Sequence, residues 1–172
     1  GGAWLPMVPK LNRAAGMFAG QGHFALGFAG DDHLPRTANW AAGYIEELRS
    51  IGTGIVYCRD GLQDERLPTQ WAMTSDIVRA LGCMVPAPVD HLFCDNAVQD
   101  LGRAGHCLSY MPAVLIEHMH PLAGKALGAA AGATMRGAGA VVRSLPGYQL
   151  ASDAVGDTLR NTSVGRHVSQ AF

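Results

Sequence analysis

The sequence of 172 residues lacks an excess of charge of either sign. Its 13 Lys and Arg residues face 14 Asp and Glu residues, which gives a formal net charge of −1. Proteins that bind the nucleic-acid backbone usually carry a basic excess, so we expect no nucleic-acid partner. A run of about 18 uncharged apolar residues, as a membrane span needs, is also lacking. The nearest candidate, residues 122–142, is interrupted by Lys125 and Arg136, and we therefore expect no membrane span.

Signals for secretion and for a cysteine framework are lacking too. Residues 1–9 contain no basic segment followed by a long apolar core, so no signal peptide is predicted. The four cysteines lie at spacings typical of neither a disulfide framework nor a zinc ribbon; they are Cys58, Cys83, Cys94 and Cys107. These absences favour a cytoplasmic chain whose thiols are reduced.

Helix and strand patterns alternate along the first two thirds of the chain. Helices are predicted over residues 7–19, 39–50, from 74 or 75 to 81, and from about 95 to 104. Short apolar runs predict strands over residues 23–29, 55–58, 67–73, 108–110 and 113–117. This alternation predicts α/β layering in one domain over residues 1–125. Residues 126–172 are Ala/Gly-rich and polar, and we expect a low-complexity tail that is helical or disordered.

The sharpest motif is Gly30-Asp31-Asp32-His33, which directly follows the predicted strand at residues 23–29. Ligands of open α/β sheets bind beyond the carboxyl ends of the strands, so acidic groups are well placed there. Two carboxylates and an imidazole suit Mn²⁺ or Mg²⁺ that carries a diphosphate. The alternative is an ordinary turn, because Gly-Asp-Asp is also common in loops.

A second candidate group lies at the end of the last predicted strand, where His118 and His120 follow Glu117. Alternation along an extended segment places both imidazoles on the same face, where they could share one metal or flank a pocket. The alternative is that these histidines are structural or merely exposed. Their spacing favours a functional role.

Asp95 opens the predicted helix at residues 95–104 and has two interpretations. It is either a helix N-cap, a position that Asp favours, or a general base held near an acceptor hydroxyl. A separate hypothesis is a structural zinc site built from His91, Cys94, His106 and Cys107. The adjacent His106 and Cys107 are poor geometry for one tetrahedral ion, which counts against it.

The order of these motifs resembles that of nucleotide-sugar glycosyltransferases with the GT-A fold, in particular family-2-like enzymes of the type encoded by actinobacterial phages. The resemblance spans about residues 7–125 and rests on residues 8–15, which include Asn12, residues 28–37, residues 76–82, the Asp95 segment and the strand that ends in His118-x-His120. Asp31-Asp32-His33 looks like that family's version of the metal-binding DxD motif. It departs from the usual Asp-x-Asp spacing.

The resemblance implies an inverting, metal-dependent transfer of a sugar from a nucleotide-sugar donor to a hydroxyl-bearing acceptor, with Mn²⁺ or Mg²⁺ as the cofactor. It implies that Asp31, Asp32 and Asn12 bind the donor and its diphosphate. It also implies that Asp32, His33 and a late histidine hold the cation, with His120 preferred over His118. Asp95 would deprotonate the acceptor.

The chain departs from that family at both ends. Family members begin with a strand, a helix and a strand that bind the nucleoside, whereas only residues 1–7 precede the matching segment here. Residues beyond Lys125 do not resemble the family's ending. We therefore expect a partial, N-terminally incomplete GT-A (Rossmann-like) mixed sheet flanked by helices. A second hypothesis follows, in which the chain is a non-catalytic structural or interaction protein whose exposed sheet edges lead to self-association.

Overall fold

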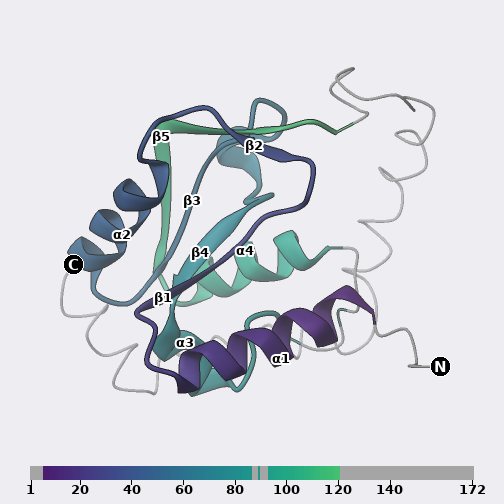
Figure 1. Cartoon of the computed structure of the whole chain (residues 1–172), viewed down its shortest axis with the longest axis vertical. Coiled ribbons are helices and arrows are strands. Elements are labelled where there is room, and N and C mark those ends of the chain that lie inside the picture. The colour runs from purple at the N-terminus through teal and green to yellow at the C-terminus, as the bar shows by residue number, and fades with distance from the viewer. Residues whose placement is uncertain (1–5, 87–88, 90–92, 121–172) are drawn as a thin grey trace.

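The structure is a computed structural model that describes residues 6–86, 89 and 93–120. These residues form a mixed α/β fold with one five-stranded sheet and four α-helices (Figure 1). The predicted α/β layering is confirmed. The tail predicted over residues 126–172 lies outside the described residues. Within the described ranges, no helix is both long enough and apolar enough to cross a membrane.

The elements follow one another along the chain as α1 (Met7–Gly20), β1 (Ala25–Phe28), β2 (His33–Pro35), α2 (Trp40–Ile51), β3 (Ile55–Arg59), the 3-10 helix η1 (Asp64–Arg66), β4 (Trp71–Thr74), α3 (Ser75–Leu81), α4 (Cys94–Ala104) and β5 (Leu108–His118). All four predicted helices are present, with bounds close to the predicted ones. Their apolar residues recur at helical spacing, as Tyr44 and Leu48 do on the buried side of α2. α2 ends at Ile51 and is followed by Gly52, whose φ of 79° is one that glycine adopts without strain.

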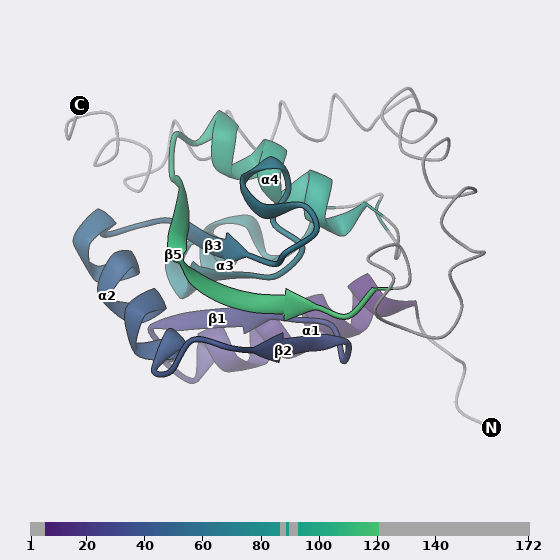
Figure 2. The same cartoon turned by 90° about the horizontal axis from the view of Figure 1, so that it is seen from above.

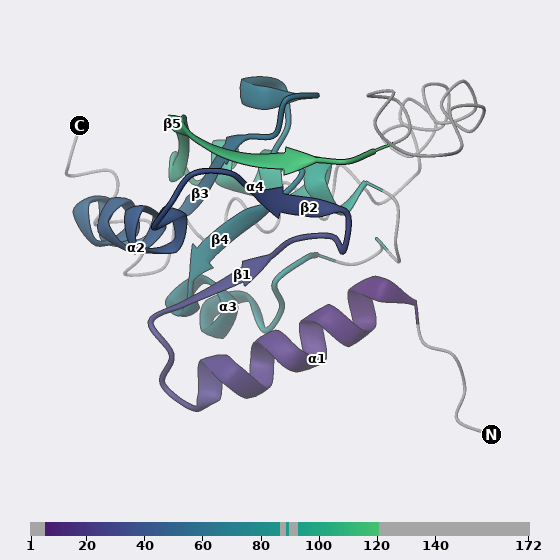
Figure 3. The same ribbon diagram turned by 45° about the horizontal axis from the view of Figure 1, so that its top comes forward.

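The strands are arranged in the order β1-β4-β3-β5-β2. β3 and β5 are parallel, while β4 is antiparallel to both of its neighbours and β2 is antiparallel to β5. The sheet curls, so that β1 and β2 lie close together at the turn that joins them although they end the strand order at opposite sides (Figure 3). Residues 29–32, which form this connection, therefore lie near both edges of the sheet.

The core has two parts, one on each face of the sheet. Alternate residues of β3 belong to different parts: Ile55 and Tyr57 pack in the cluster that contains α1, α3 and α4, whereas Val56 and Cys58 pack in the cluster that contains α2. A strand whose side chains are buried on both faces reads as a continuous apolar run, which is how residues 55–58 read in the sequence.

β5 corrects one sequence prediction. Two strands separated by Pro112 were expected, but the structure has one strand that bends sharply (Figures 1 and 2). Its register against β3 shifts between Cys58 and Arg59, whose partners are Met111 and Leu115. Pro112 lies within this irregular stretch, where a missing N–H breaks no regular ladder bond. The bend carries the end of β5 away from β3 and onto β2.

β1 and β2 correct a second prediction. Residues 23–29 read as a buried strand, but β1 covers only Ala25–Phe28, lies at an edge of the sheet and is half-buried. β2 was not predicted, because a three-residue strand that contains Pro35 has no recognisable alternation. The strand predicted over residues 67–73 begins only at Trp71.

Candidate metal centre

The turn between β1 and β2 meets the end of β5. In the β2–β5 pair, His33 lies opposite His118. The backbone N–H of Met119 donates to the carbonyl of Asp32 at 2.8 Å, and that of His118 donates to the carbonyl of Asp60 at 2.9 Å. Side chains directly opposite one another on paired strands lie within contact distance. The pairing therefore brings a histidine from the end of the described chain against the acidic motif near its start.

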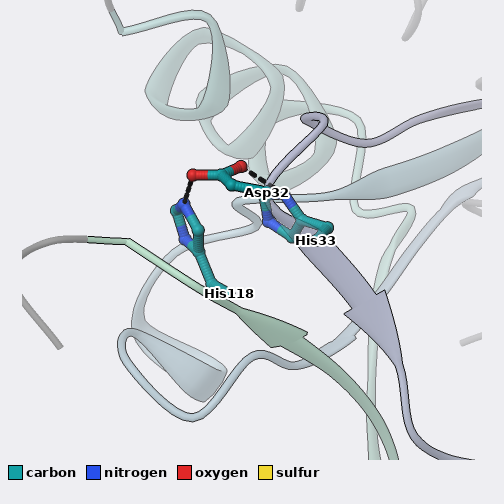
Figure 4. A group of neighbouring side chains, drawn as sticks. All are labelled: Asp32, His33 and His118. Carbon is teal, nitrogen blue, oxygen red and sulfur yellow. Dashed lines mark hydrogen bonds and ion pairs between the residues drawn. The ribbon is translucent and has the colours of Figure 1, made fainter. Parts of the chain in front are cut away.

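Asp32, His33 and His118 form a compact group (Figure 4). One carboxylate oxygen of Asp32 lies 3.2 Å from Nδ1 of His33, and the other lies 3.1 Å from Nε2 of His118. The two imidazole rings stack, with centroids 4.1 Å apart and planes 22° apart. One potential ligand atom from each residue lies within 4.8 Å of the other two. Two imidazoles and one carboxylate are a donor set that divalent transition metals accept.

The members of this group differ in exposure. The side chain of Asp32 is 38% exposed, whereas those of His33 and His118 are 4% and 13% exposed. The carboxylate therefore faces solvent, and the two imidazoles are held by the surrounding protein.

The carboxylate of Asp60, next to this group, is buried, with 1% of its side chain exposed. Burial alone would raise its pKa. The neighbouring His118 imidazole, backbone N–H groups of the loop that follows β3 and the Thr69 hydroxyl outweigh burial and hold the pKa of Asp60 well below its usual range. Asp60 is therefore an anion buried behind the two histidines.

The pKa values of the two stacked histidines are shifted in opposite directions. Burial lowers the pKa of His33, and the charge of His118 lowers it further despite the nearby carboxylates. Burial also acts to lower the pKa of His118, but its contacts with Asp60 and Asp32 outweigh burial and raise it. As the pH falls, His118 therefore takes up a proton before His33 does.

The residues present fit a divalent cation. Metal-binding imidazoles are neutral and donate their second ring N–H to a carboxylate, a carbonyl or water. Nε2 of His118 faces Asp32, while its Nδ1 is buried, has no hydrogen-bond partner and faces Asp60 at 3.6 Å. His118 therefore presents one nitrogen to the position between the three ligands and the other to an anion.

A pocket of about 220 Å³ borders this group on the side of α2. His33 and Pro35 of β2 contribute to its wall, together with Trp40 and Tyr44 of α2 and Ile116 of β5. Phe28, Gln70 and Trp71 also line it, together with three small residues, Gly27, Ala29 and Ala72, which leave space in the pocket. A ligand that reaches the group therefore has room beside His33.

The structure brings together Asp32 and His33 of the predicted cation site, and it adds His118 rather than the preferred His120. The ring of His120 lies beside His118, with centroids 5.1 Å apart and planes 69° apart. Asp31 is exposed in the turn and is not part of the group.

Asn12 and Asp95 also lie outside the group. The amide of Asn12 joins α1 to the loop after α3: its oxygen accepts the N–H groups of Met84 and Val85, both at 2.9 Å, and its nitrogen donates to the carbonyl of Val85 at 2.8 Å. Asp95 lies in the first turn of α4 and accepts the N–H of Asn96 at 2.8 Å. The N-cap of α4 is Phe93, so the N-cap interpretation of Asp95 is wrong. The donor-binding and general-base roles implied for Asn12 and Asp95 stay predictions.

The zinc hypothesis gains no support from the part of the chain that the structure describes. Cys94 and Cys107 are buried, and burial raises the pKa of each thiol to about 12. Among the described residues, Cys94, His106 and Cys107 do not come together as a group of metal ligands. His91 lies outside the described residues.

Sequence reasoning missed Asp60 and Thr69, which lie behind the group. In the sequence, residues 59–66 read as a polar loop, and Thr69 falls in the strand predicted over residues 67–73. The position of Asp60 in the sequence could have indicated it, because Asp60 follows the apolar strand at residues 55–58 as Asp31 and Asp32 follow β1.

Comparison with known proteins identifies no relative. No protein-family model matches the chain, and neither a curated protein nor a solved structure matches it significantly. Any function assigned to the chain therefore depends on its own residues and contacts.

Proposed function

We propose that the chain is a divalent-cation-dependent glycosyltransferase domain with a partial GT-A fold, which transfers a sugar from a nucleotide-sugar donor to a hydroxyl-bearing acceptor. One observation carries this proposal: the acidic motif after β1 and the late histidine motif, which the resemblance links through a shared cation, lie in contact. Both motifs lie at strand ends, where ligands of α/β sheets bind.

Asp32, His33 and His118 would hold the cation. Mg²⁺ prefers oxygen ligands and keeps several waters, whereas imidazole suits transition metals, so we expect Mn²⁺ to bind more tightly than Mg²⁺. When bound, the cation neutralises negative charge on the departing diphosphate. Asp31, exposed in the same turn, is accessible to the donor.

The transfer itself is a single displacement. The acceptor oxygen bonds to the anomeric carbon of the sugar, and the bond from that carbon to the diphosphate oxygen breaks with its electron pair. The acceptor proton passes to the carboxylate of Asp95, the proposed general base. Asn12 is left out of this scheme, because its amide is engaged with the backbone of residues 84 and 85.

Isothermal titration calorimetry tests the proposal. We expect the chain to bind Mn²⁺ and then, only with Mn²⁺ present, one of the UDP-, GDP- or dTDP-sugars. Asp32→Ala should weaken Mn²⁺ binding by at least about tenfold, because it removes a ligand. Glu46→Ala, which removes an exposed carboxylate of α2, is the matched control and should leave binding unchanged. Absence of metal and nucleotide binding, with no effect of Asp32→Ala, would overturn the proposal.

A second candidate function is a non-catalytic interaction protein. It is favoured by β1, which in the described part of the chain pairs with β4 alone. Apolar residues at the end of α1 and just before β1 are also exposed: Met17 is 53% exposed, Phe18 40% and Phe24 44%. Light scattering that shows a defined oligomer without nucleotide binding would support this function. A monomer that binds Mn²⁺ and a nucleotide sugar would count against it.

A further inference from the structure

We propose that Asp60 and Thr69 are positioning residues of the metal centre, which hold both histidines through the ring nitrogens that face away from the cation. This inference rests on the metal site of the proposed function. It adds two residues that touch neither the cation nor the substrate and act through His33 and His118.

Asp60 is fixed in place by the loop that follows β3. Its Oδ1 accepts the backbone N–H groups of three successive residues, Leu62, Gln63 and Asp64, at 2.8, 2.6 and 2.8 Å. Three hydrogen bonds to one oxygen leave the carboxylate little freedom to rotate. The position of its second oxygen is therefore set by the backbone.

That second oxygen is the point where the support for the two histidines converges. The Thr69 hydroxyl donates to Oδ2 of Asp60 at 2.7 Å, and Nε2 of His33 lies 3.4 Å from the Thr69 oxygen. Nδ1 of His118 lies 3.6 Å from the same Oδ2. One carboxylate oxygen thus faces His118 directly and His33 through a hydroxyl.

The remaining ring nitrogens point toward Asp32. Nδ1 of His33 lies 3.2 Å and Nε2 of His118 lies 3.1 Å from its carboxylate oxygens. Nδ1 of His33 also accepts the backbone N–H of Gly30 at 3.1 Å, and a bound cation would take the place of this N–H. Each histidine therefore has one nitrogen on the cation side and one on the side of Asp60 and Thr69. A carboxylate behind a metal-binding histidine fixes which nitrogen carries the proton and how the ring is oriented.

The contact between Nδ1 of His118 and Asp60 falls short of a hydrogen bond. The atom is buried and has no hydrogen-bond partner, and a separation of 3.6 Å is too long for a hydrogen bond. An unpaired buried polar atom is costly, so a small movement of the ring that lets a protonated Nδ1 donate to Asp60 is favourable. Coordination of a cation by Nε2 requires the proton of the neutral ring to reside on Nδ1. Cation binding would therefore favour the movement of Nδ1 toward Asp60.

The two oxygens of Asp60 allow the positioning role to be separated from the structural role. Asp60→Asn keeps an oxygen for the three backbone N–H groups, but replaces the second oxygen by an amide nitrogen that cannot accept from His118 or Thr69. We expect the Kd for Mn²⁺ to rise by about 10–100-fold.

Asp64→Asn is the matched control. It makes the same charge change in the same loop, and its φ of 48° is one that asparagine tolerates. The carboxylate of Asp64 accepts the N–H groups of Asp60 and Gly61, whereas the side chains of His33 and His118 interact with Asp32, Asp60 and Thr69. Its Kd for Mn²⁺ should stay within about threefold of the wild-type value, since a charge beyond direct contact is screened.

Two variants of Thr69 test the positioning role even if Asp60→Asn does not fold. Thr69→Val keeps the shape of the side chain but removes the hydroxyl, and should weaken Mn²⁺ binding. Thr69→Ser restores the hydroxyl and should restore the affinity. A structural role alone would make both variants bind Mn²⁺ as the wild type does, and that result would overturn the role of Thr69.

Nitrogen-15 NMR of the metal-free protein supplies the readout that a purely structural role would not move. In the wild type, Nε2 of His118 lies within hydrogen-bond distance of the Asp32 carboxylate, which competes with Asp60 for the ring proton. The comparison is therefore made in the Asp32→Ala background. With His118 neutral, we expect the proton on Nδ1 in Asp32→Ala and on Nε2 in Asp32→Ala/Asp60→Asn. The same tautomer in both proteins, or equal weakening of Mn²⁺ binding by Asp60→Asn and Asp64→Asn, would overturn the role of Asp60. If the wild type binds no divalent cation, the proposed function fails, while the tautomer comparison still decides whether Asp60 positions His118.

Discussion

At the scale of single residues, three aspartates around one turn differ because of their surroundings. Asp31 is exposed, Asp32 is partly exposed between two imidazoles, and Asp60 is buried under hydrogen bonds. The pKa of Asp60 is held far below its usual value, so this carboxylate is a permanent anion at neutral pH. In the proposed function these three carboxylates have different roles: Asp31 contacts the donor, Asp32 binds the cation and Asp60 orients His118.

Asn12→Ala tests whether Asn12 is structural. The change leaves the N–H groups of Met84 and Val85 without their acceptor, and we expect the free energy of unfolding to fall by about 1–3 kcal/mol. Urea unfolding measures this, with the neighbouring exposed Arg13→Ala as a control that changes stability by less than about 0.5 kcal/mol. Mn²⁺ binding should be unaffected. Unchanged stability combined with weaker nucleotide-sugar binding would instead support the donor-binding role.

At the scale of elements, the contact between α4 and β5 depends on a glycine. A Cβ on Gly102 would lie 2.9 Å from Cβ of Leu108, at the start of β5. The absence of a side chain therefore lets α4 pack close to the strand that carries His118. A Cβ on Gly16 of α1 would have no neighbour within 4 Å, so there is space for a side chain at this position.

Gly102→Ala and Gly16→Ala are accordingly expected to have opposite effects. Alanine in a helix is intrinsically favourable, and Gly16→Ala should raise the free energy of unfolding by about 0.4–1 kcal/mol. At Gly102 the clash with Leu108 outweighs that gain, and stability should fall by about 1–3 kcal/mol. Chemical denaturation of the two variants measures both values. Stabilisation by Gly102→Ala would mean that α4 and β5 are less tightly packed than the structure shows.

At the scale of the whole molecule, the buried carboxylate of Asp60 makes the free energy of unfolding depend on pH. The pKa of Asp60 is lower in the folded chain than its usual value of 3.8, so its contribution is present above that pH and is lost as the pH falls toward the folded-state value. The sign follows because the unfolded chain takes up the proton first. Acid therefore favours the unfolded state through this group.

The difference in unfolding free energy between the wild type and Asp60→Asn measures this contribution. Without metal, we expect the wild type to be more stable by about 1–3 kcal/mol at neutral pH, since a buried charged acceptor is lost in the variant. The difference should shrink as the pH is lowered from about 5 to 3. A difference that does not change with pH over this range would show that Asp60 contributes through packing and not through its charge.

Much of the fold follows from local sequence, and the candidate site only in part. The helices were predictable because apolar spacing, as in α2, and a terminal glycine act over a few residues. Asp32 and His33 were predictable because a run of polar residues directly follows an apolar one. β2 was missed and β5 was divided at Pro112, since both depend on partners that are distant in the sequence.

By itself, the sequence determined that helices and short strands alternate and that an acidic motif and two histidines follow strands. Tertiary structure alone decided that His118, and not His120, joins Asp32 and His33. Alternation places both histidines on one face, but only the register of β5 against β2 sets which of them lies opposite His33. The same long-range packing places Asp60 behind His118. Local propensity carries no information about such contacts, because they form only when the sheet closes.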